Sequence, residues 1–299
     1  MLSFLLKNHE IGHYSGYQTR VFADYFYELS SEDDIAKLAE IYQWTQNERI
    51  PLLIIGGGTN LLFASDLYEG VVIKNSLSGW QYDTVSNILY TSSDESIWEI
   101  ANQLETKYYQ PLWHRFIGLP GSIGGAIYGN AGCFGLETES NFVSCEVYDM
   151  LSNEQKTIPK SEMGFSYRHS FLKDNPHLFL ISATFDLSEK HEKYHSDVDN
   201  IYFREHQQPK GNSCGSFFKN PSKENSAGSL IERVGLKGYR HGGAYWSTLH
   251  ANFLMSDGLS CPPSDLIGLV GLTQEIVKKE TGIELENEVR IIENIPSKK

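Results

Sequence analysis

The sequence of 299 residues lacks a long apolar run, a paired cysteine motif and a basic cluster, and each absence excludes a class of protein. Its apolar runs are far shorter than the roughly 20 residues that a membrane-spanning helix needs, so we expect no membrane segment. The four cysteines stand far apart without a C-x-x-C pair, which favours free thiols in a reducing cytoplasm over disulfides or a zinc site. The first residues include neither a basic region nor a small-residue cleavage site, so we expect no export signal.

Positive charge is also scarce. The 38 acidic residues exceed the 25 basic residues and give a formal net charge of −13. Because a nucleic-acid groove needs a concentrated positive footprint, we expect no nucleic-acid partner. Anionic small molecules can still bind where backbone N–H groups and a few placed lysines or arginines converge. The hydrophobic content of 40% is enough for a sizeable core and excludes a disordered chain.

Hydrophobic patterning predicts both helices and strands. Helical spacing predicts helices over 35–42, over 94–104 with Asp94 as the cap, and over 265–281 with Asp265 as the cap. Apolar runs and alternating patterns predict strands at 52–55, 71–73, 88–91, 142–148, 178–187 and 283–292. The polar stretch 188–211 is the best candidate for a domain boundary.

Two segments are rich in glycine. The first, 56–60, follows a predicted strand, but Leu61 replaces the third glycine of the dinucleotide fingerprint and the next predicted strand leaves no room for a helix. It is therefore either a phosphate cradle of another fold or an ordinary turn. The second segment, 118–135, holds seven glycines in 18 residues. Its backbone could approach a flat cofactor or a diphosphate closely, or the glycines could serve tight packing.

Two segments match the zinc motif H-E-x-x-H, at 9–13 and 191–195. Zinc needs both histidines on one helix face and a third ligand. Gly12 weakens a helix in the first segment, and Thr19 stands where a third histidine would belong. The second segment lies in a polar stretch without an apolar face, so we expect no metal site.

Five motifs follow one another in a fixed order along the chain. They are GGGTNLL at 56–62, GLPGSIGGAIYGNAGCFG at 118–135, YRHSFLK at 167–173, GSFFKNP at 215–221 and LENEVRII at 285–292. In these motifs the chain resembles the UDP-N-acetylenolpyruvoylglucosamine reductases, over residues from about 19 to 292. The segments 227–238 and 250–253 resemble the type that lacks an extra tyrosine-bearing substrate loop.

This resemblance implies an activity and a fold. NADPH would reduce a bound FAD, which would reduce the enolpyruvyl group of a UDP-sugar to give UDP-N-acetylmuramate in the cytoplasm, during peptidoglycan synthesis. The implied fold is α+β, with a two-part FAD-binding domain like that of FAD-linked oxidases and a smaller α+β substrate-binding domain. We expect a monomer. The segment 18–24 lacks the glycine pair that members usually carry before Ala23, which leaves open how the FAD-binding region closes over the cofactor.

The domain boundaries follow from the same resemblance. Residues 1–75, rejoined by 283–299, would form the first FAD-binding subdomain. Residues 76–187 would form the second FAD-binding subdomain, and residues 188–282 would form the substrate-binding domain.

The resemblance also assigns three catalytic residues. Arg168 would contact the substrate carboxylate, because a guanidinium matches a carboxylate bidentately and stays charged. Ser216 would protonate C2 of the substrate, which a weak acid can do only from a rigid, dry position. Glu288 would be the second catalytic acid. Spacing alone leaves other interpretations open: an arginine packed on its neighbouring tyrosine, a turn serine, and Glu284 or Glu286 on the same strand face.

The remaining expected site residues bind the cofactor or the substrate. FAD would be held by residues of the two glycine-rich segments: Gly56, Gly57, Gly58, Thr59, Asn60, Leu61, Gly118, Pro120, Gly121, Ser122, Gly124, Gly125, Asn130 and Gly132. The UDP-sugar would be bound by Tyr167, Lys219, Asn220 and His250. Asn220 is equally compatible with a plain turn, and His250 with a structural histidine.

Two other functions fit part of this pattern. Another FAD-linked oxidoreductase of the same fold would keep the glycine-rich segments but would not need Ser216, Lys219 and Asn220 together. A non-catalytic UDP-sugar-binding protein would bind the nucleotide without a flavin.

Overall fold

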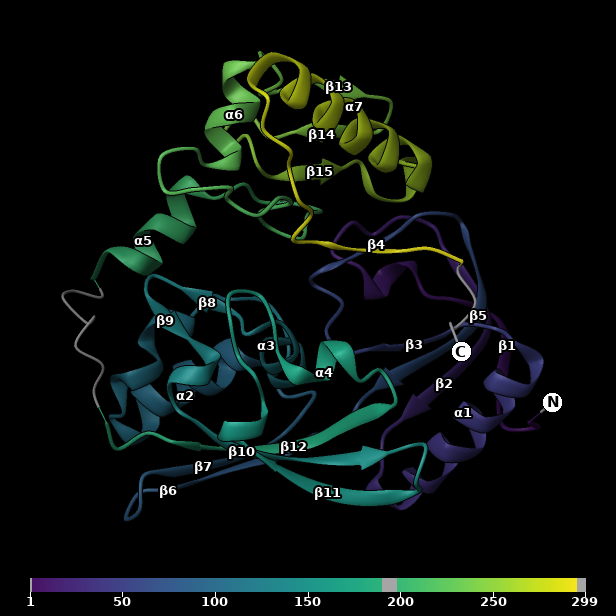
Figure 1. The fold of residues 1–299 in the computed structure, drawn as a ribbon. Helices are drawn as coiled ribbons and strands as arrows, with labels where there is room; N and C mark the ends of the chain where they lie inside the picture. Colours follow the sequence, from purple (N-terminus) through teal and green to yellow (C-terminus); the bar gives the residue numbers. More distant parts are fainter. Residues whose placement is uncertain (1, 190–197, 295–299) are drawn as a thin grey trace.

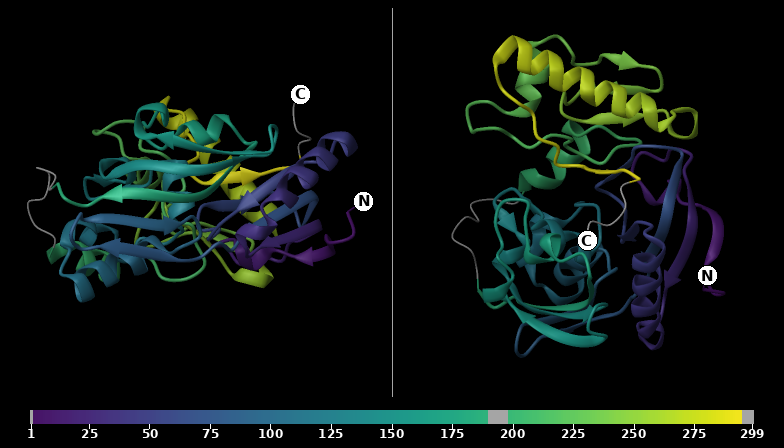
Figure 2. Two further views of the ribbon diagram at one scale, coloured as in Figure 1. Left: turned by 90° about the horizontal axis from the view of Figure 1, so that it is seen from below. Right: turned by 45° about the vertical axis from the view of Figure 1, so that its right-hand side comes forward.

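The computed structural model describes residues 2–189 and 198–294 and has an α+β architecture, which confirms the predicted fold class. Two sheet-and-helix units lie side by side, and a third, smaller unit sits above them (Figure 1). The view turned by 45° about the vertical axis again shows the third unit above the other two (Figure 2). Within the described ranges, no helix is long and apolar enough to cross a membrane.

The first unit is a four-stranded sheet in the order β1-β2-β5-β3, with helix α1 (Ala36–Glu48) on one face. Its strands are β1 (Leu6–Glu10), β2 (Phe22–Leu29), β3 (Leu52–Ile55) and β5 (Leu67–Asn75). β1 is antiparallel to β2, whereas β5 is parallel to β2 and β3. Because side chains alternate along a strand, Val71 and Ile73 pack against α1 and Val72 packs on the opposite face.

The second unit is a five-stranded antiparallel sheet in the order β11-β10-β12-β7-β6, with helices against one face. Its strands are β6 (Trp80–Asp83), β7 (Ile88–Ser92), β10 (Phe142–Asp149), β11 (Glu154–Pro159) and β12 (Leu178–Asp186). Its helices are α2 (Ile97–Tyr108), α3 (Ile123–Gly129) and the short α4 (Phe171–Asp174). Aromatic rings fill its core, where Trp113 packs edge-to-face on Phe116 and Phe185.

The third unit is a three-stranded antiparallel sheet, β13-β14-β15, packed against two helices. Its elements are β13 (Arg240–His241), β14 (Ala244–Trp246), β15 (Leu254–Ser256), α6 (Ala227–Arg233) and α7 (Pro263–Thr281). Trp246 is fully buried in its core, and the indole N–H donates to Thr273 Oγ1 at 2.9 Å. Helix α5 (Val198–Gln207) precedes this unit and lies within the polar stretch that the sequence marked as a boundary.

The end of the chain returns from the third unit to the first. Strand β16 (Arg290–Ile292) pairs in parallel with β4 (Leu61–Phe63), which follows the first glycine turn directly. A short ribbon of β8 (Gly132–Cys133) and β9 (Leu136–Glu137) ends the second glycine-rich segment. The sequence missed β4, because a three-residue strand carries too little pattern to separate it from the glycine turn.

Asp94 does not cap the helix that follows it, contrary to our prediction. The cap of α2 is Ser96, whose Oγ accepts the N–H of Glu99 at 3.4 Å. The Asp94 carboxylate instead pairs with Lys74, with 2.7 Å between Nζ and Oδ2. Asp and Ser are both favourable N-cap residues. Here the carboxylate of Asp94 is bound to the buried Lys74, and Ser96 caps the helix.

The last helix and the last strand also differ in their bounds from the prediction. Helix α7 begins at Pro263, so Asp265 lies inside its first turn and accepts the N–H of Gly243 at 2.8 Å. The strand predicted over 283–292 is confined to β16. Its earlier residues make single hydrogen bonds to a loop of the third unit, so no continuous ladder forms there.

Candidate active site

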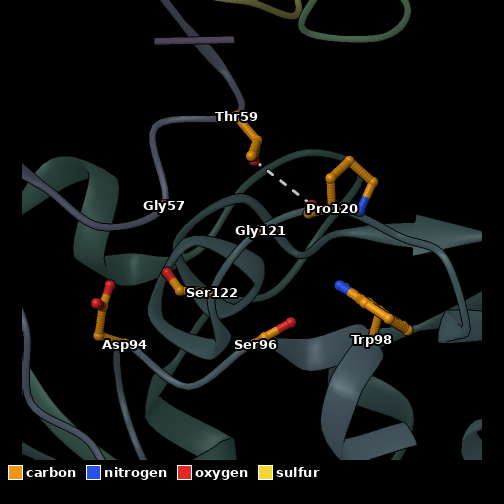
Figure 3. Close-up of a pocket in the computed structure, with 8 residues that line it drawn as sticks. All are labelled: Gly57, Thr59, Asp94, Ser96, Trp98, Pro120, Gly121 and Ser122. Carbon is orange, nitrogen blue, oxygen red and sulfur yellow. Dashed lines mark hydrogen bonds between the residues drawn. The ribbon is translucent and has the colours of Figure 1, made fainter. Parts of the chain in front are cut away.

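Two glycine turns face each other across a hollow (Figure 3). A Cβ atom on Gly57, in the turn after β3, would lie 3.5 Å from the Cα of Gly121 in the second turn. Thr59 Oγ1 donates to the Pro120 carbonyl at 3.4 Å and so links the two turns. The structure thus brings together the two segments that the sequence analysis assigned to one cofactor.

The hollow has a volume of about 310 Å³. It is lined by the two turns and the beginning of α2, through Gly57, Thr59, Asp94, Ser96, Trp98, Pro120, Gly121 and Ser122. The indole of Trp98 is 39% exposed and offers a flat apolar surface. In the part of the chain that the structure describes, Asp94 Oδ1 is buried without a hydrogen-bond partner. A flat surface, bare glycine backbone and an unsatisfied carboxylate oxygen fit the ring, phosphates and hydroxyl groups of a nucleotide cofactor.

Two positions in these turns require glycine. Gly58 has a φ of +65°, and a Cβ there would lie 1.6 Å from the Tyr14 carbonyl oxygen. Gly121 has a φ of +124°, and a Cβ there would lie 2.9 Å from Thr59 Oγ1. A side chain at 58 would displace the backbone of Tyr14, and a side chain at 121 would push against Thr59 of the first turn, so glycine allows the close approach at both positions.

The other predicted cofactor residues of the two turns lie beside these positions: Gly56, Asn60, Leu61, Gly118, Gly124 and Gly125. A Cβ on Gly56 would lie 2.6 Å from Ser122 Oγ, the same oxygen that accepts the N–H of Gly125 at 3.3 Å. The N–H of Gly124 donates to the Ser93 carbonyl at 2.6 Å, which ties the second turn to the end of β7. Close backbone packing therefore accounts for part of the glycine content.

Arg168 occupies a strained hairpin turn. The backbone groups of Ser166 and His169 bond to each other in both directions, at 3.2 and 3.1 Å, and enclose Tyr167 and Arg168. The φ of Arg168 is +58°, a left-handed conformation that costs a non-glycine residue about 1–2 kcal/mol. Glycine or asparagine would be preferred here, so the surrounding contacts must hold the arginine in place.

The side chain of Arg168 makes contacts on several sides. Its Nε donates to Glu288 Oε1, and its Nη2 donates to the Gly132 carbonyl at 3.4 Å. The guanidinium carbon lies 4.8 Å from the ring centroid of Tyr167. Asn130 also supports the turn, because its Nδ2 donates at 3.1 Å to the carbonyl of Ser166, the first residue of the hairpin. Packing on the tyrosine and pairing with the acid therefore occur together.

Glu288 lies where the three units meet. Its N–H donates to the Phe217 carbonyl at 2.8 Å, in a loop of the third unit. Its own carbonyl accepts Asn60 Nδ2 at 3.2 Å, in the first glycine turn. Its carboxylate reaches Arg168 in the second unit, and the two side chains are only 22% and 18% exposed. One residue thus joins the cofactor turns to the candidate catalytic groups.

Ser216 is carried on the loop that contacts Glu288. It directly precedes Phe217 and forms an isolated β-bridge with Phe253. The N–H of Phe217 donates to the Asn252 carbonyl at 2.8 Å, and the Phe217 ring is fully buried. The serine is therefore held on a rigid, partly buried support beside Glu288.

The structure separates the three glutamates that spacing could not. Glu284 is paired with a lysine of α7, and Glu286 with Lys219. Their side chains are 74% and 72% exposed, whereas that of Glu288 is 18% exposed. Of the three, Glu288 is the one paired with Arg168, which favours it as the site acid.

Lys219 and Asn220 lie on the same loop as Ser216 but differ in their contacts. The ammonium of Lys219 pairs with Glu286, whose side chain is 72% exposed, whereas the Lys219 side chain is 27% exposed. Asn220 Oδ1 accepts the N–H of Ala227 at 3.0 Å, at the start of α6. The side-chain oxygen of Asn220 therefore stabilises the turn before α6. Its amide nitrogen is the group that could donate to a phosphate.

His250 lies in a bend of the third unit. Its Nδ1 accepts the N–H of Asn252 at 3.3 Å, and its ring centroid lies 4.7 Å from that of Phe253. Burial lowers the pKa of His250, so the ring is neutral near pH 7. These contacts hold the ring in the bend, three residues before Phe253, the bridge partner of Ser216.

The sequence analysis missed three residues around Arg168. Lys173 Nζ donates to the Arg168 carbonyl at 2.5 Å. Both Lys173 Nζ and Arg290 Cζ lie near the ring of Tyr128, at 5.6 and 5.8 Å from its centroid. All three residues belong to the quoted motifs, but their roles depend on contacts between segments that sequence spacing does not reveal.

The charged side chains of this region leave it positive. Four cations stand against two carboxylates, namely Arg168, Lys173, Lys219 and Arg290 against Glu286 and Glu288. The whole chain carries a formal net charge of −13, so this excess is local. It suits a ligand that bears a carboxylate or a diphosphate.

The H-E-x-x-H segments do not form a helical metal site where the structure describes them. Residues 9–13 run from β1 into the 3₁₀ turn Gly12–Tyr14, so the two histidines do not share a helix face. The ring of His9 instead stacks on Phe26, with 4.0 Å between centroids. Across 2–189 and 198–294, no cluster of three His, Cys, Asp or Glu side chains could hold a metal ion. The segment 191–195 lies outside the described residues.

Comparison with known proteins identifies the class of protein that the two turns belong to. Residues 24–153 match the family model of an FAD binding domain, so the chain is a flavoprotein. Residues 207–292 match the C-terminal domain of UDP-N-acetylenolpyruvoylglucosamine reductase.

Relatives cover nearly the whole chain. A UDP-N-acetylenolpyruvoylglucosamine reductase of Synechococcus sp. (strain RCC307) is 33% identical over 291 residues, which cover 95% of this chain and 93% of the relative. The reductase of Protochlamydia amoebophila is 36% identical, over 90% of this chain and 88% of its own. The chain therefore belongs to the UDP-N-acetylenolpyruvoylglucosamine reductase family and is an FAD-dependent oxidoreductase. FAD and NADPH are the cofactors that this membership supports.

A solved structure shares the fold. The crystal structure of UDP-N-acetylenolpyruvylglucosamine reductase from Thermus caldophilus matches with a TM-score of 0.77 at 24% identity. The match covers 96% of this chain and 99% of that protein. The two-part FAD-binding domain with a smaller third unit, expected from the resemblance, is thereby confirmed.

Proposed function

We propose that the protein reduces UDP-N-acetylglucosamine enolpyruvate to UDP-N-acetylmuramate in peptidoglycan synthesis, with NADPH as the source of electrons. The observation that carries this proposal is the Arg168–Glu288 pair, which is held between the first glycine turn and the loop of Ser216. The names of the relatives and the positive charge of the site support the same substrate. The bare backbone of the two glycine turns would hold the FAD pyrophosphate.

The enolpyruvyl group gains a hydride at C3 and a proton at C2. When bound, FAD supplies the hydride chemistry between NADPH and this group. The protein's own side chains have to stabilise the negative charge that spreads from C2 into the substrate carboxylate, and then deliver the proton.

Arg168 is proposed to stabilise that charge. Its guanidinium stays ionised at every relevant pH and matches the planar carboxylate. The ion pair to Glu288 and the packing on Tyr167 fix its position before the substrate arrives. Because little reorganisation is then needed, its charge acts mainly in the transition state.

Ser216 is proposed to donate the proton to C2. A hydroxyl is a weak acid, so it can protonate only a strongly basic carbon and only from a fixed position. The bridge to Phe253 and the buried ring of Phe217 provide that position. Glu288 would act together with Arg168 on the substrate while it carries negative charge at C2 and on its carboxylate.

The diphosphate of the substrate is proposed to bind on the loop after Ser216. Lys219 would bring a cation, and Asn220 would bring an amide nitrogen. Tyr167 and His250 remain proposed contacts to the sugar. The chain is proposed to lack the extra tyrosine-bearing loop and to work in the cytoplasm as a monomer.

The division of the chain is also a proposal. The first sheet ends at Asn75, and the five-stranded sheet ends at Asp186, which supports subdomains 1–75 and 76–187. The pairing of β16 with β4 supports the return of 283–299 to the first subdomain, with 188–282 as the substrate domain.

The proposal is tested by the visible spectrum of the purified protein in anaerobic rapid mixing. The oxidised flavin bands should disappear on addition of NADPH and return on addition of UDP-N-acetylglucosamine enolpyruvate. UDP-N-acetylglucosamine, which lacks the enolpyruvyl group, serves as the matched control and should leave the flavin reduced.

The two alternative functions give different results in this experiment. A flavin that is reoxidised by another alcohol or sugar substrate but not by the enolpyruvyl sugar would indicate another oxidoreductase of this fold. A colourless protein that binds the UDP-sugar and takes up no FAD would indicate a non-catalytic binding protein.

A further inference from the structure

The strained turn of Arg168 is held by a hydrogen bond to its backbone as well as by the bonds of its side chain. Lys173 lies in α4, five residues after Arg168, and its Nζ reaches back to donate to the Arg168 carbonyl at 2.5 Å. The start of α4 is itself fixed, because the buried Ser170 donates its hydroxyl to the Tyr128 carbonyl at 2.8 Å. The lysine therefore works from a rigid base.

We propose that Lys173 is a positioning residue for the reductase reaction: it holds the left-handed backbone of Arg168 so that the guanidinium meets Glu288. This inference rests on the proposed function of the site. It follows from the geometry, since a residue with a φ of +58° keeps that conformation only when its neighbours over-determine it. The ammonium bond to the carbonyl is the contact that acts on the strained residue's own backbone.

The ammonium of Lys173 is surrounded by groups from several elements. The charged or titratable groups that face it are Arg168 of the hairpin, Lys219 of the third unit, Glu288 and Arg290 of the last segment, and Tyr128 of α3. Burial lowers the pKa of Lys173, and Lys219 lowers it further. Glu288 raises it, while Arg290 and Arg168 lower it again.

This setting links the position of Arg168 to pH. A charged donor bonds to a carbonyl more strongly than a neutral amine does. As the pH rises through the lowered pKa of Lys173, the anchor weakens and the guanidinium should lose its fixed position. An arginine at 173 would stay charged over this range and would preserve the anchor.

The closing experiment compares Lys173→Met, Lys173→Arg and a matched control. The control is Lys156→Met, which removes a lysine bound to Asp149 at 2.6 Å on the edge of the five-stranded sheet. Rapid mixing measures flavin reduction by NADPH and flavin reoxidation by the UDP-sugar at several substrate concentrations and pH values.

For Lys173→Met we expect reoxidation at saturating substrate to slow by about tenfold or more, with reduction by NADPH nearly unchanged. Lys173→Arg should restore most of the rate and move the alkaline limb of the pH profile upward. Lys156→Met should behave as the parent. Lys173→Gln provides a second neutral variant if the methionine variant does not fold.

A readout without substrate separates this inference from the proposed function. The Nε–H proton of Arg168, assigned by its loss in Arg168→Ala, should give a sharp NMR signal in the ¹⁵N-labelled parent and in Lys173→Arg. It should be broadened or shifted in Lys173→Met.

Two results would overturn the positioning role. One is an unchanged Nε–H signal in Lys173→Met. The other is a normal rate at saturating substrate with only a weaker apparent affinity, which would make Lys173 a substrate-binding group. A parent protein that the UDP-sugar does not reoxidise would refute the proposed function instead, and the NMR comparison would still decide the role of Lys173.

Discussion

Replacing Arg168 by alanine should remove most of the second half-reaction and leave the first nearly intact. The substitution takes away the cation that we assign to the developing carboxylate charge. It leaves the two glycine turns untouched, so FAD should still bind and NADPH should still reduce it. The two half-reactions therefore respond differently to one change.

The size of the effect follows from the surroundings of the guanidinium. Losing one preorganised charge-stabilising donor slows an enzyme by a factor on the order of 10² to 10³. Arg168 carries a full charge and is only 22% exposed, so we expect the upper half of this range. Glu288, 18% exposed, would also lose its partner and stand unpaired beside the negative substrate.

A glycine variant separates catalysis from folding. Alanine at 168 keeps the strain of the left-handed turn, which has a φ of +58°, whereas glycine relieves it. Arg168→Gly should therefore melt at a higher temperature than Arg168→Ala, by the equivalent of about 1 kcal/mol. Both variants should lose the same catalytic factor if the charge is what matters.

The assay is anaerobic rapid mixing, with flavin absorbance followed in both directions. Arg240→Ala is the matched control, because Arg240 also pairs with a carboxylate, at 2.5 Å from Asp257, and lies 4.2 Å from the ring centroid of Tyr245. Its side chain is 49% exposed on the third unit, so its loss should not affect either half-reaction. An Arg168→Ala variant that the UDP-sugar reoxidises at the parental rate would refute the assignment.

Three further predictions test other parts of the structure. Ser216→Ala should leave flavin reduction by NADPH unchanged and slow reoxidation by the UDP-sugar in rapid mixing; equal reoxidation rates would make Ser216 a turn residue. Gly58→Ala should lose FAD on gel filtration, because the new Cβ would lie 1.6 Å from the Tyr14 carbonyl; a fully yellow variant would contradict the rigid turn. Burial opposes ionisation of Asp149, but Lys156 and two backbone N–H groups outweigh it and lower its pKa from 3.8 to about 2. The resulting stability is present above pH 4 and lost as the pH falls toward 2, so melting curves of Asp149→Asn should depend less on acid than those of the parent.

The turn conformation of the first glycine segment could be predicted from the sequence because it is a local property, whereas its role in binding FAD came from the resemblance and stays a prediction. A run such as 56–58 signals a bare backbone turn wherever it occurs, and Gly58 does adopt the left-handed conformation that only glycine takes without cost. The motif order then added Arg168, Ser216 and Glu288. Their roles remain predictions, although the structure brings the arginine and the acid into direct contact.

The supporting contacts could not be predicted because they join distant segments. Asp94 satisfies every local rule for a helix cap, yet the buried Lys74 of another strand takes its carboxylate. Lys173 is an ordinary lysine at the end of a motif, and its anchor role appears only once the turn of Arg168 is seen to be left-handed. Nothing in the spacing of YRHSFLK reveals that backbone conformation.

The candidate catalytic groups come from separate units and are joined by contacts between distant segments. Glu288 is 120 residues from Arg168 and 228 residues from Asn60 along the chain, yet it contacts both. Contacts of such separation cost more loop-closure entropy than local contacts do. Both glycine turns lie within residues 24–153, which match the FAD-binding family model, whereas the Arg168–Glu288 pair requires the end of the chain to return from the third unit. Substrate chemistry at this site therefore depends on the docking of all three units, and a variant that loosens β16 from β4 should retain flavin and lose reoxidation by substrate.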